Sequence, residues 1–225
     1  MTRRIISRLT VIGILLFTDA AVAIEWDIQP YVGADYVYVN MPGWNSTFYS
    51  PYYNSLFTFS GPDVLPESYP GASLYGGIKF AENFGFEAGA DWFKHKEQTT
   101  VMLVPTATFT SKVKRDGFHL DIVGFVPLTD TFTLSGFLGI GWIKPRIEST
   151  YSVNGRLAQS IPIYSSTNAI ARVGFGGSLM ITETIGLRAR LLVECTEYLH
   201  VNTPYGTRYP FDDSVGVTLG IFAAF

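Results

Sequence analysis

Hydrophobic and polar residues alternate along most of the chain after residue 26. In the last such segment Val215, Val217 and Leu219 alternate with Gly216 and Thr218. Successive side chains of a β-strand point to opposite faces, so this period of two predicts strands with one apolar face and one polar or small face. Eight segments of this kind follow one another, at residues 27–38, 73–80, 84–92, 118–126, 133–142, 172–179, 186–196 and 214–225.

The number and length of these segments favour a membrane barrel. Eight is an even number, and each segment is close to the roughly 9–11 residues that a tilted transmembrane strand needs. No run approaches the roughly 18 apolar residues of a transmembrane helix. Because lipid offers no hydrogen-bond partner to an open strand edge, membrane-spanning strands must close on themselves. The sequence therefore predicts an all-β fold, an eight-stranded antiparallel up-and-down transmembrane β-barrel.

The distribution of charge predicts which face of each strand points outward. A soluble β-sandwich or lipocalin-type barrel also alternates, but it turns its large apolar residues inward. Here glycine, hydroxyl and charged residues share one parity, which suits the narrow interior of eight strands, while Phe86, Leu138 and Val217 share the other. We therefore expect the large apolar side chains to face lipid.

The connections between segments alternate in length. Four are long and three are short, and the two kinds alternate along the chain. This asymmetry is typical of extracellular loops and periplasmic turns. The short connections lie at residues 82–83, 128–131 and 182–184, and the long ones at 41–71, 94–117, 144–168 and 200–213.

The N-terminal 23 residues have the three parts of a secretory signal. Arg3, Arg4 and Arg8 precede a short apolar stretch from Leu9 to Phe17, and the Ala-Val-Ala of residues 21–23 is a cleavage site. The alternative, an N-terminal membrane anchor, needs a longer apolar stretch. We expect a signal peptide at residues 1–23, a barrel domain at 24–225, and a mature protein in the outer membrane.

The composition argues against several other classes of protein. Charged residues make up 16% of the chain, against about 25% in an average soluble protein. The single cysteine excludes an internal disulfide. The formal net charge of −3 argues against a nucleic-acid partner, which requires a basic face.

Several charged residues have the parity predicted to face the interior. A buried charge is costly unless it is paired, so these residues predict a structural salt-bridge network that fills the lumen. The alternative is an ion-conducting pore, for which an eight-stranded barrel leaves little room. The predicted network consists of Lys79, Glu87, Asp91, Asp121, Arg172, Arg188, Arg190 and Glu194.

The chain gives little indication of catalysis. A Ser/His/acid set requires contact between its members, and His119 is expected opposite about residue 140, about 16 Å from Ser135. No His/Cys cluster has the spacing of a metal site. We therefore expect no enzymatic activity, no metal and no cofactor.

The first long connection is unusually rich in aromatic residues. Tyrosine and tryptophan are frequent at contact hot spots, so an exposed loop of this kind could be a binding surface. Equally, the loop could pack on itself or on lipopolysaccharide sugars. The candidate surface comprises Trp44, Phe48, Tyr49, Tyr52, Tyr53, Phe57 and Tyr69.

The last strand and the short turns resemble a known family. Residues 215–225 end in the aromatic Phe225, which looks like the signal read by the outer-membrane assembly machinery. The turns before Phe-Gly-Phe-Glu at 84–87 and Ile-Gly-Leu-Arg at 185–188 resemble those of the opacity/OmpA-like barrels.

The resemblance supports the barrel fold, and together with the lack of a catalytic set it leads us to expect a non-enzymatic outer-membrane protein with an adhesive or a membrane-structural role. Its expected partners are outer-membrane lipid, lipopolysaccharide, the assembly machinery and, for an adhesin, an extracellular or host ligand. A narrow porin-like channel is the alternative, and a lipid-modifying enzyme is the less favoured one.

Overall fold

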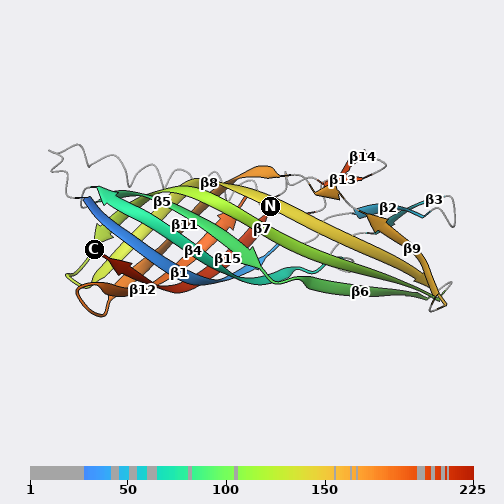
Figure 1. Cartoon of the computed structure of the whole chain (residues 1–225), viewed down its shortest axis with the longest axis horizontal. Helices are drawn as coiled ribbons and strands as arrows, with labels where there is room; N and C mark the ends of the chain where they lie inside the picture. Colours follow the sequence, from blue (N-terminus) through green and yellow to red (C-terminus); the bar gives the residue numbers. More distant parts are fainter. Residues whose placement is uncertain are drawn as a thin grey trace.

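Most strands of the chain belong to one long sheet that closes into a tube (Figure 1). The computed structural model describes residues 28–41, 46–50, 55–59, 65–80, 83–103, 106–154, 156–162, 164–165, 167–196, 201–203, 206–208, 211 and 213–225. The signal peptide expected at residues 1–23 lies outside them. Among the described residues no helix is long and apolar enough to cross a membrane.

Eight strands make up the barrel, and each pairs antiparallel with the next in sequence. The last of them pairs with the first, from Tyr31 opposite Ala224 to Asn40 opposite Val215, and this seam closes the tube. The predicted fold class is therefore confirmed. The eight are β1(Ile28–Asn40), β4(Ser68–Phe80), β5(Phe84–Phe93), β7(Thr106–Pro127), β8(Phe132–Val153), β11(Asn168–Met180), β12(Ile185–Glu194) and β15(Ser214–Ala224).

Within the described parts of the long connections lie seven shorter strands. Two of them extend the barrel sheet, since β6 pairs with β7 and β9 pairs with β8. The others form a hairpin, β2 with β3, and a three-stranded sheet in the order β10-β13-β14. Their bounds are β2(Ser46–Ser50), β3(Ser55–Phe59), β6(Lys96–Leu103), β9(Arg156–Pro162), β10(Tyr164–Ser165), β13(Val201–Thr203) and β14(Gly206–Arg208).

The two faces of the barrel wall differ as the alternation predicts. Phe86, Leu138 and Val217 are 51%, 57% and 40% exposed on the outside, where lipid would cover them. Charged side chains of the opposite parity, such as Glu87 and Arg190, are buried inside. The sidedness is therefore that of a membrane barrel and the inverse of a soluble one.

The two ends of the barrel are built differently. At one end, which we call the turn end, two tight turns have the same construction: Phe132 N donates to Thr129 Oγ1, and Ile185 N donates to Thr182 Oγ1, both at 2.9 Å. A threonine hydroxyl that accepts from the backbone fixes a short reversal without a glycine. The other end, the loop end, receives all four long connections.

Two of the strands are much longer than the sequence predicts. β7 and β8 have 22 residues each, and they stay paired up to Ala107 opposite Val153. Residues 106–116 and 144–153 were expected in loops. Instead, together with β6 and β9, they form a four-stranded sheet that continues beyond the other strands of the barrel, here called the extended sheet (Figure 1).

Candidate functional site

The centre of the barrel interior is organised around the carboxylate of Glu87 on β5. Arg188 Nη1 donates to Glu87 Oε2 at 2.6 Å, and Arg190 Nη1 donates to Glu87 Oε1 at 2.9 Å. The hydroxyl of Tyr31 donates to the same carboxylate at 3.2 Å. The other nitrogen of the Arg188 fork donates to Asp35 Oδ2 at 2.6 Å, so one guanidinium joins β5, β12 and β1. Forked, charge-assisted contacts of this kind are the strong ones in a protein interior.

A second set of ion pairs lies around Glu194 on β12. Arg115 Nη2 donates to Glu194 Oε2 at 2.5 Å, and Ser214 Oγ donates to the same oxygen at 3.0 Å. Arg172 Nε lies 3.6 Å from Glu194 Oε1, while Arg172 Nη1 donates to Asp91 Oδ2 at 3.4 Å. All of these residues are buried. The pairs therefore connect neighbouring strands and opposite walls across the lumen.

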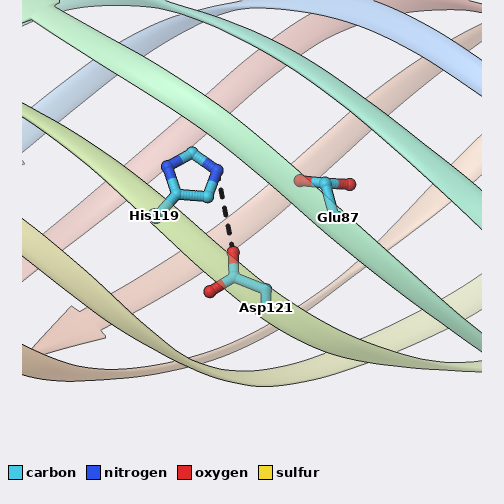
Figure 2. Close-up of side chains that lie close together, drawn as sticks. All are labelled: Glu87, His119 and Asp121. Atoms are coloured by element: carbon cyan, nitrogen blue, oxygen red, sulfur yellow. Dashed lines mark ion pairs between the residues drawn. The ribbon is translucent and has the colours of Figure 1, made fainter.

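His119 lies between two carboxylates. Its Nδ1 is 3.2 Å from Asp91 Oδ2, and its Nε2 is 3.7 Å from Asp121 Oδ2, the contact drawn in Figure 2. The described network holds five buried carboxylates, of Asp35, Glu87, Asp91, Asp121 and Glu194, and four buried guanidiniums. The imidazole of His119 links the carboxylates of Asp91 and Asp121 within this network.

Glu87, His119 and Asp121 could also contact a metal ion together. One ligand atom of each lies within 4.8 Å of the others, and all three side chains are buried (Figure 2). Both oxygens of Glu87, however, already accept hydrogen bonds from Arg188 and Arg190. A divalent cation would have to stand beside two guanidiniums, which repel it. The arrangement therefore fits an ion-pair network better than a metal centre.

The residues predicted to fill the lumen do not all take part in ion pairs. Glu87, Asp91, Arg172, Arg188, Arg190 and Glu194 pair directly, and Asp121 reaches His119. Lys79 differs, because no ion pair joins it to another described residue and its Nζ lies 5.7 Å from the centre of the Phe125 ring. It lies opposite Gly85, nearer the turn end than the network.

Sequence reasoning missed three members of the network. Asp35 and His119 had inward parity but were not assigned to it. Arg115 was expected in a loop, although it lies two residues before Gly117 and so has the parity of His119 and Asp121. Extending the alternation by one more pair of residues would have found it.

Glycines make room for these large side chains. Gly139 lies opposite Asp121, and Gly220 lies opposite Asp35 on one side and Arg188 on the other. A Cβ atom at either glycine would overlap the facing aspartate Oδ1 and a backbone carbonyl oxygen. The small residues on the inward parity therefore have a steric role in accommodating the charges.

An apolar layer closes the lumen between the network and the loop end. The cavity within the network has a volume of about 20 Å³, enough for about one water molecule. Beyond it Arg115 stacks over the ring of Phe93, 4.7 Å from its centre. The layer is built of Val37, Val39, Met41, Leu65, Tyr69, Phe93, Val113, Ile143, Ile147, Ile170 and Phe211, all of them buried.

The aromatic surface expected in the first long connection needs one correction. Tyr69 is 0% exposed, because it belongs to the inward face of β4, and its hydroxyl donates to the carbonyl oxygen of Pro66 at 2.5 Å. Phe48 and Tyr49 lie on β2 and Phe57 on β3, with Phe48 opposite Phe57. Trp44, Tyr52 and Tyr53 lie outside the described residues.

Comparison with known proteins gives a family and a set of related folds. The family described as "Outer membrane protein beta-barrel domain" matches residues 10–198. No curated protein sequence matches the chain.

Several solved structures are similar in fold. The outer membrane protein OprG from Pseudomonas aeruginosa is 13% identical, with a TM-score of 0.49 over 89% of this chain and 97% of that one. Ail, the attachment invasion locus protein of Yersinia pestis, is 14% identical, with a TM-score of 0.44 over 90% and 100%. The outer membrane protease OmpT from Escherichia coli is 8% identical, with a TM-score of 0.39 over 92% and 99%. Similarity at this level concerns the fold alone.

Proposed function

Because the chain belongs to the outer membrane protein β-barrel domain family, we propose that it is a non-enzymatic surface protein whose closed barrel anchors the extended sheet outside the cell. Its role would be contact with an extracellular or host ligand. In this proposal residues 1–23 direct secretion and are removed, the assembly machinery recognises the strand β15 together with Phe225, and the loop end faces outward.

The length of β7 and β8 is the observation that carries this proposal. A tilted membrane strand needs roughly 9–11 residues, and each of these strands has 22. The additional residues are ordered, paired and flanked by β6 and β9. A sheet that extends beyond the barrel adds surface for contact with a partner, which supports a binding role over a purely structural one.

A narrow porin-like channel is the second candidate, and the interior gives it less support. Arg188 and Arg190 are held by carboxylates in the middle of the lumen, and the apolar layer lies between them and the loop end. An ion would have to displace these ion pairs and then cross the apolar layer, which is unfavourable without water.

A lipid-modifying enzyme receives less support again. His119 faces Asp91 and Asp121, and no described serine lies in hydrogen-bond contact with it. Ser135 lies opposite Phe125, while His119 lies opposite Gly141, one residue further than expected. The ring is also buried, so a lipid substrate would not reach it.

Shortening the extended sheet tests the proposed role. Residues 98–111 would be replaced by an Asn-Gly turn, which joins Glu97 to Lys112 directly because these residues already pair. We expect cells that express the shortened protein to lose attachment to an epithelial monolayer. The barrel itself should still fold, as judged by its heat-modifiable migration on a gel.

The matched control is Thr99→Ser with Thr110→Ser, which keeps the strands and their cross-strand hydroxyl contact. This variant should attach as the wild type does. Undiminished attachment of the shortened protein would refute the proposed surface role for the β6–β7 hairpin. Greater detergent sensitivity of cells lacking the protein, without any loss of attachment, would instead support a membrane-structural role.

A further inference from the structure

The outer surface of β7 and β8 changes character at one level. Towards the turn end the outward side chains are apolar, and the last of them, Phe118 and Trp142, face each other with their rings stacked at 4.9 Å. The next outward positions towards the loop end are Asp116 and Lys144, which also face each other. Since apolar rings favour the edge of the hydrocarbon layer, a membrane around the barrel would place its lipid headgroups near Asp116 and Lys144.

Four cations lie at this level or at the next outward position, and we call them the basic crest: Lys94, Lys114, Lys144 and Arg146. Lys114 lies opposite Arg146 on neighbouring strands. Lys94 directly follows Phe93, the last residue of β5, and lies two positions after the outward Trp92, which faces Asp116. The crest therefore spans three adjacent strands directly above exposed aromatic rings.

The crest has more positive charge than its surroundings neutralise. Asp116 pairs with Lys114 at 2.7 Å. Within the described part of the chain, no ion pair closer than 4.0 Å joins Lys94, Lys144 or Arg146 to a carboxylate. Even with Glu148, the next outward residue of β8 after Arg146, four cations stand with only two carboxylates on a chain whose overall formal charge is −3.

We propose that the basic crest binds the phosphate groups of lipopolysaccharide lipid A in the outer leaflet, while acyl chains lie against Trp92, Phe118 and Trp142. A guanidinium contacts phosphate through two parallel hydrogen bonds, and the lysines supply point charges beside it. The proposal rests on the outward orientation of the loop end given above. It adds a defined lipid site to a protein proposed to act beyond the membrane.

The position of the crest favours a lipid over a soluble polyanion. The crest lies immediately above the apolar belt, and the next cation outward on β7, Lys112, is already paired with Glu97 at 3.4 Å. A dissolved sulfated sugar would have to reach the membrane surface to meet the free charges. A phosphorylated lipid is placed there by its own acyl chains.

Calorimetric titration of the full-length protein in non-ionic detergent micelles tests the site. The probes are bisphosphorylated lipid A and the same lipid A after removal of its phosphates. Each surface cation contributes comparably to binding at an anionic membrane, so Lys144→Gln with Arg146→Gln should weaken binding of the phosphorylated lipid about thirtyfold. Binding of the dephosphorylated lipid should be weak and equal in both proteins.

The matched control is Lys112→Gln with Arg156→Gln, which removes two exposed cations further out along the extended sheet. It should bind phosphorylated lipid A as the wild type does. If both double variants lost the same affinity for phosphorylated lipid A, net charge alone would explain the effect and the proposed site would be wrong. Equal binding of both lipids by the wild type would also contradict the site. Binding of a sulfated oligosaccharide without binding of lipid A would assign the crest to a soluble polyanion instead. Each of these results is independent of the attachment assay, which uses a different part of the sheet.

Discussion

Arg188 holds two carboxylates from different strands with one guanidinium, those of Glu87 and Asp35. Replacing it with leucine leaves Asp35 buried inside the barrel without an ion pair to any residue that the structure describes. Since a buried charge that loses its partner costs about 3–5 kcal/mol, Arg188→Leu should lower the free energy of unfolding by about that amount. Urea unfolding in lipid vesicles measures it.

Lys79→Gln is the control for this prediction, because Lys79 faces the same lumen without an ion pair among the described residues. Its contact with the Phe125 ring should contribute about 1 kcal/mol or less. If the two variants lost equal stability, the ion pairs would not be what holds the interior together.

Gly139 tests the steric role of the interior glycines. A methyl group there would overlap Asp121 Oδ1 and the carbonyl oxygen of Leu120, whereas one at the outward Gly76 would meet its nearest atoms at 3.8 Å. Gly139→Ala should therefore destabilise the barrel by about 1–3 kcal/mol, as overpacking does, and Gly76→Ala should be nearly neutral. The fraction that remains folded on a gel as temperature rises gives the comparison. Equal melting of both variants would contradict it.

For single residues, the sequence predicts which way a side chain points better than it predicts which residue that side chain pairs with. Parity alone tells that Glu87, Arg172 and Arg190 point inward, because a strand allows two orientations only. It does not tell that Arg188 joins Asp35 to Glu87 across three strands, since that depends on the shear of the closed sheet and on rotamers. Lys79 has the right parity, but it lies too near the turn end to reach the network.

Along β8 the cost of a charge should depend on depth. Leu138 faces lipid within the apolar belt, and Glu148 lies on the same side of the strand beyond Lys144. Leu138→Arg should cost about 2–4 kcal/mol, the value for arginine near the midplane of a bilayer, and Glu148→Arg about 1 kcal/mol or less. Unfolding titrations in vesicles of fixed thickness measure both. Equal costs would mean that the apolar belt does not mark the membrane.

The true length of β7 and β8 could not be read from the same alternation. Inside the membrane the outward residues are apolar, which makes the pattern clear. Above it Lys112 and Lys114 alternate with Ser111 and Val113, so the outward face is polar and the familiar pattern is lost. The backbone hydrogen bonds between β7 and β8 continue whether the outward side chains are apolar or polar. The extension is therefore visible in the strand pairing of the structure and not in the sequence pattern.

For the whole molecule, the closed interior has a consequence for conductance. The ion pairs around Glu87 and Glu194 fill the middle of the lumen, and the apolar layer covers them towards the loop end. We expect no single-channel steps above leak when the purified protein is inserted into planar bilayers at neutral pH. Regular steps that vanish on Val37→Trp, a change within the apolar layer, would establish a pore and refute the closed barrel.

The pairing of β1 with β15 constrains the order of events when the barrel folds. Tyr31 lies beside Ala224, so the tube cannot be sealed until residues almost two hundred positions apart have met. Pairing at such a separation makes a high contact order and slow folding. Until these two strands pair, the apolar outer faces and the unpaired strand edges would be exposed to water. Aggregation would then compete with folding. We therefore expect the pairing of β1 with β15 to be the last and slowest step in the folding of the barrel.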